Sequence, residues 1–225
     1  LNTTAAAFTA PTNLSITSSA TLTTNAATFT ATTLTLNDLA LTLVNTTLTV
    51  TNAVTLDNAN EQIITGTNDF TLTAAPTFSN GAITSAGGTI TFSDVAGTTI
   101  SGGTFDCTGS TLSLNGDLNL SGSAFTAPTT LVLNTNPTTL TGAGTISVTT
   151  LTLNDLALTL ASTNLTVTNA VTIDNANEQI ITAGNNLTLT AAPVMSLGQL
   201  TSSGGTVTMP AATTITSGTF DMSST

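Results

Sequence analysis

The sequence predicts an all-β protein, and specifically a three-sided parallel β-solenoid (β-helix) with about 20 residues in each rung, or complete turn. Three observations predict this fold: a long internal repeat, a shorter periodic pattern of apolar triplets, and a composition rich in threonine and turn-forming residues. We expect one continuous solenoid over residues 1–225, built from two tandem repeats of about 117 residues, approximately 1–117 and 118–225.

The long repeat is clearest in one twelve-residue segment. VTLDNANEQIIT at 54–65 returns as VTIDNANEQIIT at 171–182, and the two copies differ only in Leu56 against Ile173. Other segments repeat in the same way, with an offset that falls from 117 to 115 residues near the C-terminal end: LTLNDLALTL at 34–43 and 151–160, FTAP at 8–11 and 125–128, and GTFD at 103–106 and 218–221. Two copies of one long unit are typical of repeat architectures.

The shorter pattern consists of apolar triplets with a polar middle residue. This alternation has the two-residue period of a β-strand with one buried face. Triplets begin at 34, 54, 70, 90, 112, 131 and 151, and further triplets about seven residues apart predict three strands in each rung. Asn, Asp, Gly, Ser and Pro between the triplets predict the corners. We expect about six rungs per repeat, eleven or twelve rungs in all, and one interior stack that contains Leu34, Val54, Phe70, Ile90, Leu112 and Leu131.

Energetics favour stacked rungs over isolated ones. Burying an apolar side chain contributes about 1.5–3 kcal/mol, whereas ordering each residue costs about 1–2 kcal/mol, so a rung needs its neighbours. Cys107, the single cysteine, is expected as a small buried side chain, and the large core fillers are expected to be Phe8, Phe70, Phe92, Phe105, Phe125 and Phe220. An antiparallel β-sandwich is the alternative fold, although its strands are usually longer.

The charge composition excludes several classes of partner. The chain has eleven carboxylates and no Lys, Arg or His, which gives a net charge of -11. Binding to nucleic acid or to an anionic membrane surface depends on cationic side chains, so neither partner is expected. No apolar stretch approaches the length of a membrane-spanning helix, so membrane insertion is not expected. A hydrophobic content of 40% distinguishes the chain from a disordered acidic segment.

The strongest candidate for chemistry is the DNANE segment, residues 57–61 and 174–178. Its paired carboxylates are the groups that glycoside hydrolysis needs, but no cationic or tyrosine partner is available. A solvated corner, in which Asn58 and Asn60 make side-chain-to-backbone turns, is the simpler interpretation. We therefore expect no catalytic residues and no enzyme activity. Calcium is the one cofactor left open, because it prefers oxygen ligands; its candidate ligands are Asp38, Asp155, Asp57, Asp174, Glu61 and Glu178.

Threonine- and asparagine-rich triplets of the LTL and LTV type, as at 34–36 and 48–50, resemble the β-strand repeats of bacterial secreted adhesins and autotransporter passenger domains. The resemblance is compositional and covers essentially the whole chain. It implies a secreted β-solenoid stalk, extracellular or at the cell surface.

The function that these features predict is structural: a stiff, protease-resistant extracellular fibre or stalk. The expected partner is a second copy of the chain, through axial stacking of open ends and lateral bundling of rods. Without Lys or Arg, such a rod offers no site to trypsin-like proteases. Two alternatives stay open, a stalk segment of an adhesin and a threonine-rich ice-binding solenoid. The presence of threonine on every expected face argues against ice binding, because an ice-binding surface would concentrate threonine on one face.

Overall fold

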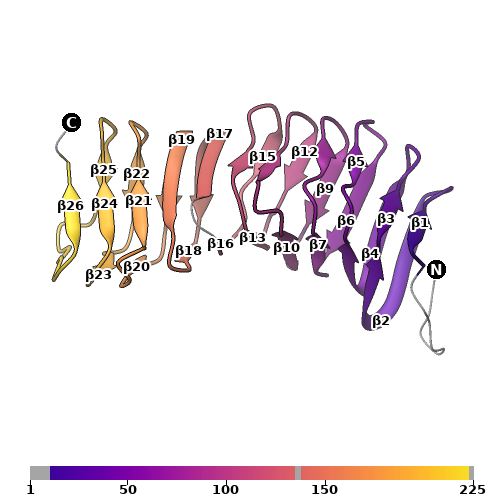
Figure 1. Cartoon of the computed structure of the whole chain (residues 1–225), viewed down its shortest axis with the longest axis horizontal. Coiled ribbons are helices and arrows are strands. Elements are labelled where there is room, and N and C mark those ends of the chain that lie inside the picture. Colours follow the sequence, from indigo (N-terminus) through magenta and orange to yellow (C-terminus); the bar gives the residue numbers. More distant parts are fainter. Residues whose placement is uncertain (1–10, 135–137, 223–225) are drawn as a thin grey trace.

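The computed structural model describes residues 11–134 and 138–222, and over these residues the chain is all-β, without a helix. Parallel strands stack into a β-solenoid of about ten rungs, roughly 20 residues apart. The rungs follow one another along the long axis, so that β1 and β26 lie at opposite ends of the rod (Figure 1). The predicted fold class is therefore confirmed.

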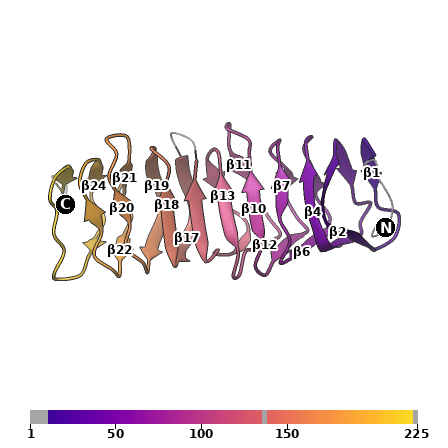
Figure 2. The ribbon, with the colours of Figure 1, turned by 90° about the horizontal axis from the view of Figure 1, so that it is seen from below.

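Three stacks of strands form the three faces of the solenoid, and Figure 2 shows them from a second side. The first face consists of β1 (Asn13–Ser15), β3 (Thr33–Thr35), β5 (Thr55–Leu56), β8 (Thr77–Phe78), β11 (Thr98–Thr99), β14 (Leu118–Asn119), the first halves of β17 (Thr138–Val148) and β19 (Ala157–Val167), β21 (Gln179–Ile181), β24 (Gln199–Thr201) and β26 (Thr219–Asp221).

The second face consists of the first halves of β2 (Ala20–Ala31) and β4 (Ala40–Val50), β6 (Gln62–Gly66), β9 (Ala82–Ser85), β12 (Thr104–Asp106), β15 (Ala124–Thr126), the second halves of β17 and β19, β22 (Leu187–Leu189) and β25 (Val207–Thr208). The third face consists of the second halves of β2 and β4, β7 (Phe70–Leu72), β10 (Thr89–Phe92), β13 (Thr111–Leu114), β16 (Thr130–Leu133), β18 (Thr150–Leu153), β20 (Thr172–Ile173) and β23 (Val194–Met195).

Alternating apolar and polar residues place one side of each strand in a continuous core. In β13 and β16 the two leucines are buried and the residues between them are half-exposed. The rings of Phe92 and Phe105 stack with their centroids 5.5 Å apart. Of the expected fillers, Phe70, Phe92 and Phe105 are buried, Phe125 is half-buried, Phe220 is exposed, and Phe8 lies outside the described residues. Phe29 and Phe78 are buried fillers that the expected set omitted.

The long strands bend at the corners where they pass from one face to the next. Asn25, Asn45 and Ser162 adopt positive φ angles of 57°, 48° and 54° there, a left-handed conformation in which asparagine is enriched. Inside one of these corners, the buried Thr46 hydroxyl accepts a hydrogen bond from the backbone N–H of Thr24 at 2.8 Å. The hydroxyl that this corner buries is thus satisfied within the solenoid.

The expected interior stack is correct for four of its six members. Phe70, Ile90, Leu112 and Leu131 are paired in register on the third face. Leu34 and Val54 are not part of this stack, because both belong to the first face.

Leu34 pairs with Leu14, and Val54 leads into β5. The residues that precede Phe70 in the stack are Leu48 and Phe29. The 16-residue step from Val54 to Phe70 spans only two of the three faces, so it is two thirds of a rung rather than a full one.

This correction changes how the sequence repeat fits the solenoid. Leu34 and Leu151 are equivalent in the repeat, yet Leu34 lies on the first face and Leu151 on the third. One repeat of 117 residues therefore spans five and two-thirds rungs instead of six, and the second copy is turned by a third of a rung relative to the first. Leu48 and Leu151 are five rungs and 103 residues apart, so a rung takes more than 20 residues, and the chain forms about ten rungs rather than eleven or twelve.

Candidate functional site

The DNANE segment of the first repeat forms the corner between β5 and β6. The Glu61 carboxylate turns back into the corner, where its Oε2 accepts hydrogen bonds from the backbone N–H groups of Asp57 at 2.8 Å and Asn58 at 3.2 Å. Asn58 closes the corner in turn: its carbonyl accepts from the N–H of Glu61 at 3.0 Å, and its Oδ1 accepts from the N–H of Asn60 at 3.0 Å. The side-chain-to-backbone turn expected at Asn58 is therefore present.

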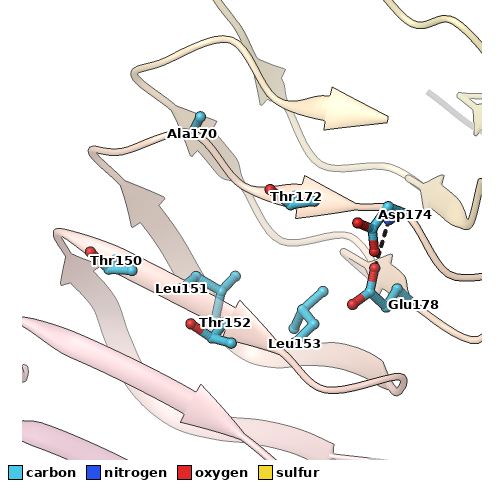
Figure 3. A pocket seen from close by; sticks show the side chains of 8 residues that line it. All are labelled: Thr150, Leu151, Thr152, Leu153, Ala170, Thr172, Asp174 and Glu178. Carbon is cyan, nitrogen blue, oxygen red and sulfur yellow. Dashed lines mark hydrogen bonds between the residues drawn. The ribbon is translucent and has the colours of Figure 1, made fainter. Parts of the chain in front are cut away.

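The DNANE segment of the second repeat forms the corner between β20 and β21 with the same bonds. Glu178 Oε2 accepts from Asp174 N–H at 2.7 Å and from Asn175 N–H at 3.2 Å, the first of which Figure 3 shows as a dashed line. Both glutamates are buried, with exposed fractions of 7% for Glu61 and 5% for Glu178, whereas Asp57 and Asp174 are exposed. Because backbone N–H groups hold it, the buried carboxylate serves as a cap of the corner.

A groove accompanies each DNANE corner. Around Glu178 its volume is about 330 Å³, and Thr150, Leu153 and Thr172 are among the lining residues (Figure 3). A groove of about 190 Å³ lies at the equivalent place around Glu61. Within the described residues, β18 pairs only with β16, and β20 only with β23. The groove at Glu178 therefore lies at a break in the strand ladder of the third face.

The capping bond occurs at the place where the ladder breaks. In a parallel sheet, alternate N–H groups of a strand donate to the neighbouring strand. The N–H of Asp174 at the end of β20 donates instead to Glu178 of its own corner. This N–H is therefore not available to β18, and Thr150, Thr152 and Thr172 are among the residues that line the space between the two strands.

The remaining calcium candidates lie one rung before the DNANE corners: Gln62 N–H donates to the Leu39 carbonyl at 3.3 Å, and Gln179 N–H donates to the Leu156 carbonyl at 3.1 Å. Asp38 and Asp155 are exposed at the corners that precede β4 and β19, with positive φ angles of 63° and 58°. In residues 11–134 and 138–222, no three His, Cys, Asp or Glu side chains come together in an arrangement that could hold a metal ion. Each of the six candidates thus lies in a corner with at most one other carboxylate beside it.

Cys107 directly follows β12 and lies in the core, with an exposed fraction of 0%. Burial raises the pKa of its thiol far above the ordinary value of 9.0, and the negative charge of Asp106 raises it further. Because the thiolate is the reactive form of cysteine, this thiol is chemically inert in the folded protein. The prediction of a small buried side chain at this position is confirmed.

The outward side of the third face carries two ranks of hydroxyl side chains. Over seven consecutive rungs, the residues on either side of the buried central residue are Thr or Ser at twelve of fourteen positions, and the exceptions are Asp69 and Val132. We name this surface the threonine face; its triplets are TFT at 28–30, TLT at 47–49, DFT at 69–71, TIT at 89–91, TLS at 111–113, TLV at 130–132 and TLT at 150–152.

Sequence reasoning missed the threonine face because it assigned two of the triplets to the wrong stack. With Leu34 and Val54 in that stack, the flanking residues include Ala53, and the ranks do not stand out from the threonine elsewhere. The signal that identifies the face is the 16-residue step, which is too short for a full rung.

Among residues 11–134 and 138–222, no helix could span a membrane. Comparisons of the chain with models of protein families, with curated proteins and with solved structures find no match. The interpretation of function therefore depends on the architecture and surfaces of the solenoid itself.

Proposed function

We propose that the chain is a structural module of a stiff extracellular rod, which lengthens by axial stacking of solenoid rungs and thickens by lateral bundling. The observation that supports axial stacking best is the exposed Phe220 ring of β26. Among the described residues the strand ladder of the first face runs from β24 to β26, and a further strand can extend such a ladder.

Phe220 stacks on Leu200 in register, but its exposed fraction is 38%, whereas that of Leu200 is 0%. A further rung, whether from the same polypeptide or from a second copy, would bury the Phe220 ring and extend the strand ladder of the first face. Stacking thus combines apolar burial with ladder hydrogen bonds, which are the two interactions that hold the rungs together inside the chain.

The charge pattern supports lateral bundling that depends on solution conditions. All charged side chains are acidic, so parallel rods repel one another at neutral pH and low salt. Salt screens this repulsion over about 8–10 Å at physiological ionic strength, and carboxylates in general take up protons toward about pH 4. Bundling is therefore favoured by salt and by acid. The resemblance to adhesin and autotransporter repeats supports an extracellular setting for such a rod.

Electron microscopy between about pH 4 and pH 8, at low and at physiological salt, tests this function. We expect filaments of uniform width whose bundling increases with salt or acid. Phe220→Asp places a charge at the open end and should shorten the filaments. The matched control is Val95→Asp, which adds the same charge at a corner residue with an exposed fraction of 73% and should leave filament length unchanged. Monodisperse monomers of the wild type under every condition would contradict axial stacking.

A further inference from the structure

The threonine face has the regularity of a lattice. From β2 to β18 its strands pair in register over seven rungs, and the register shift of the β2–β4 pair falls before this face begins. Neighbouring hydroxyls are therefore separated by about 4.7–4.9 Å along the rod and by about 6.4–6.8 Å, two residues, along a strand. Threonine is β-branched and restricted at χ1, so the hydroxyl and methyl groups hold these positions before any ligand arrives.

Threonine is concentrated on this face relative to the second face, and strand preference does not explain the difference. The neighbouring second face is built from the same kind of short strand, but its outward ranks include Ile64, Ala82, Asp106 and Ala124. The sequence repeat does not produce the concentration either. The copy of the 28–30 triplet at 145–147 lies on the second face, because the second repeat is turned by a third of a rung.

The hydroxyls of the threonine face are available to a ligand. Of its eleven threonine side chains, only that of Thr150 takes part in a hydrogen bond with another described residue, as acceptor from Asn169 Nδ2 at 3.1 Å. Hydroxyls in the corners behave differently: Thr46 and Ser110, for example, are buried and bonded within the solenoid. A threonine hydroxyl can donate one hydrogen bond and accept two, so the face offers a two-dimensional array of donors and acceptors.

We propose that the threonine face binds the surface of ice. The face suits a flat, uncharged lattice, since it has one carboxylate, no cation and no exposed aromatic ring. Its hydroxyls repeat in two directions, as the oxygen atoms of an ice surface do, and each hydroxyl can donate one hydrogen bond to water and accept two. The inference goes beyond the structural rod and does not depend on it, because a single copy of the chain carries the whole face.

Thermal hysteresis and partition of the protein into a growing ice hemisphere measure this activity directly. We expect the wild type to show both. Thr91→Tyr places a bulky ring at the centre of the face and should remove most of the hysteresis. Thr84→Tyr is the matched control, because Thr84 has the same half-exposed setting in the middle of a short strand on the second face, one strand earlier in the chain, and should leave the hysteresis unchanged. Circular dichroism checks that each variant keeps the fold.

A milder pair separates the two groups of the side chain. Thr91→Val keeps the methyl group and the β-branch, and Thr91→Ser keeps the hydroxyl; partial losses in both would support a role for each group. Three results would overturn the proposal: no hysteresis and no ice partition in the wild type, equal losses in Thr91→Tyr and Thr84→Tyr, or binding of the wild type to crystalline cellulose without binding to ice. The last result would assign the face to a polysaccharide.

Discussion

The two DNANE corners have the same sequence and the same hydrogen bonds, but they turn the chain between different faces. The first leads from the first face to the second, and the second leads from the third face to the first. The capping distances agree within 0.1 Å, at 2.8 Å for Glu61 and 2.7 Å for Glu178. The local sequence therefore determines the corner, whereas the number of residues between corners determines the face on which it lies.

The third-of-a-rung rotation has a consequence for any longer array of this repeat. A third copy would be turned once more, and only a fourth copy would present its DNANE corner on the same face as the first. The corners and their grooves would follow a three-fold screw around the rod. Surfaces that stay on one face across the two copies, as the threonine face does from β2 to β18, then require residues that differ between equivalent positions of the repeat.

The largest expected effect comes from removing the capping carboxylates. Glu61→Ala and Glu178→Ala each leave two backbone N–H groups without their acceptor. One hydrogen bond to a charged group contributes about 1.5–3 kcal/mol, so the loss of two such bonds should lower the free energy of local opening by at least about that amount in each variant. Because the bonds are the same, the loss should be equal in the two corners. Native-state hydrogen exchange at residues 55–65 and 172–182 measures it.

Asp57→Ala and Asp174→Ala provide the control for these variants. They remove an exposed carboxylate from the same corner, and no hydrogen bond of either side chain is present among the described residues. Local opening should therefore stay close to that of the wild type. A loss that differs strongly between Glu61→Ala and Glu178→Ala would mean that the surrounding rungs, and not the DNANE sequence, determine the stability of the corner.

Much of this architecture follows from the sequence. Alternation in triplets such as 112–114 predicts the strands, Asn58 predicts the turn, and Met222, the counterpart of Cys107 in the second repeat, predicts a buried side chain at that position. The assignment of triplets to faces fails at one step, and the reason is physical. Every face has the same apolar-polar-apolar triplet, and rungs between successive third-face strands vary from 19 to 22 residues. A 16-residue step can then be mistaken for a short rung, which shifts Leu34 and Val54 to the wrong stack.

The capping role of Glu61 and Glu178 could not be read from the sequence. A glutamate four residues after an aspartate suggests two carboxylates side by side, because spacing alone does not show which way a side chain turns in a corner. The structure places the glutamate inward on backbone N–H groups and the aspartate outward.

A smaller effect distinguishes the repeats at Cys107, whose counterpart in the second copy is Met222. The native pKa of the thiol is raised above its unfolded value of about 9, so the protonated thiol favours the folded state below that pH, and this contribution is lost as the pH rises. Above about pH 9 the free energy of unfolding should fall by about 1.4 kcal/mol per pH unit. Denaturant titrations of the wild type between about pH 8 and pH 11 measure the slope.

Cys107→Ala isolates the thiol from the other groups that titrate at high pH. The variant is destabilised at every pH by the lost packing, but the additional decline above about pH 9 should disappear. An identical pH slope in the variant and the wild type would show that this decline does not come from Cys107.

The smallest effect is expected from the double variant Glu61→Gln and Glu178→Gln. Glutamine keeps one side-chain oxygen that can accept from the N–H groups of Asp57 and Asp174, so both corners should still form, with bonds about half as strong because the acceptor is neutral. Filaments and fold should be nearly unchanged. The same variant tests the interpretation of the DNANE carboxylates as structural, since a glutamate that acted as a general acid or nucleophile could not be replaced by an amide. We expect no hydrolysis of polysaccharides by either protein in an assay of released reducing ends. Cleavage by the wild type that the double variant loses would show that the two grooves are active sites and that Glu61 and Glu178 are catalytic groups.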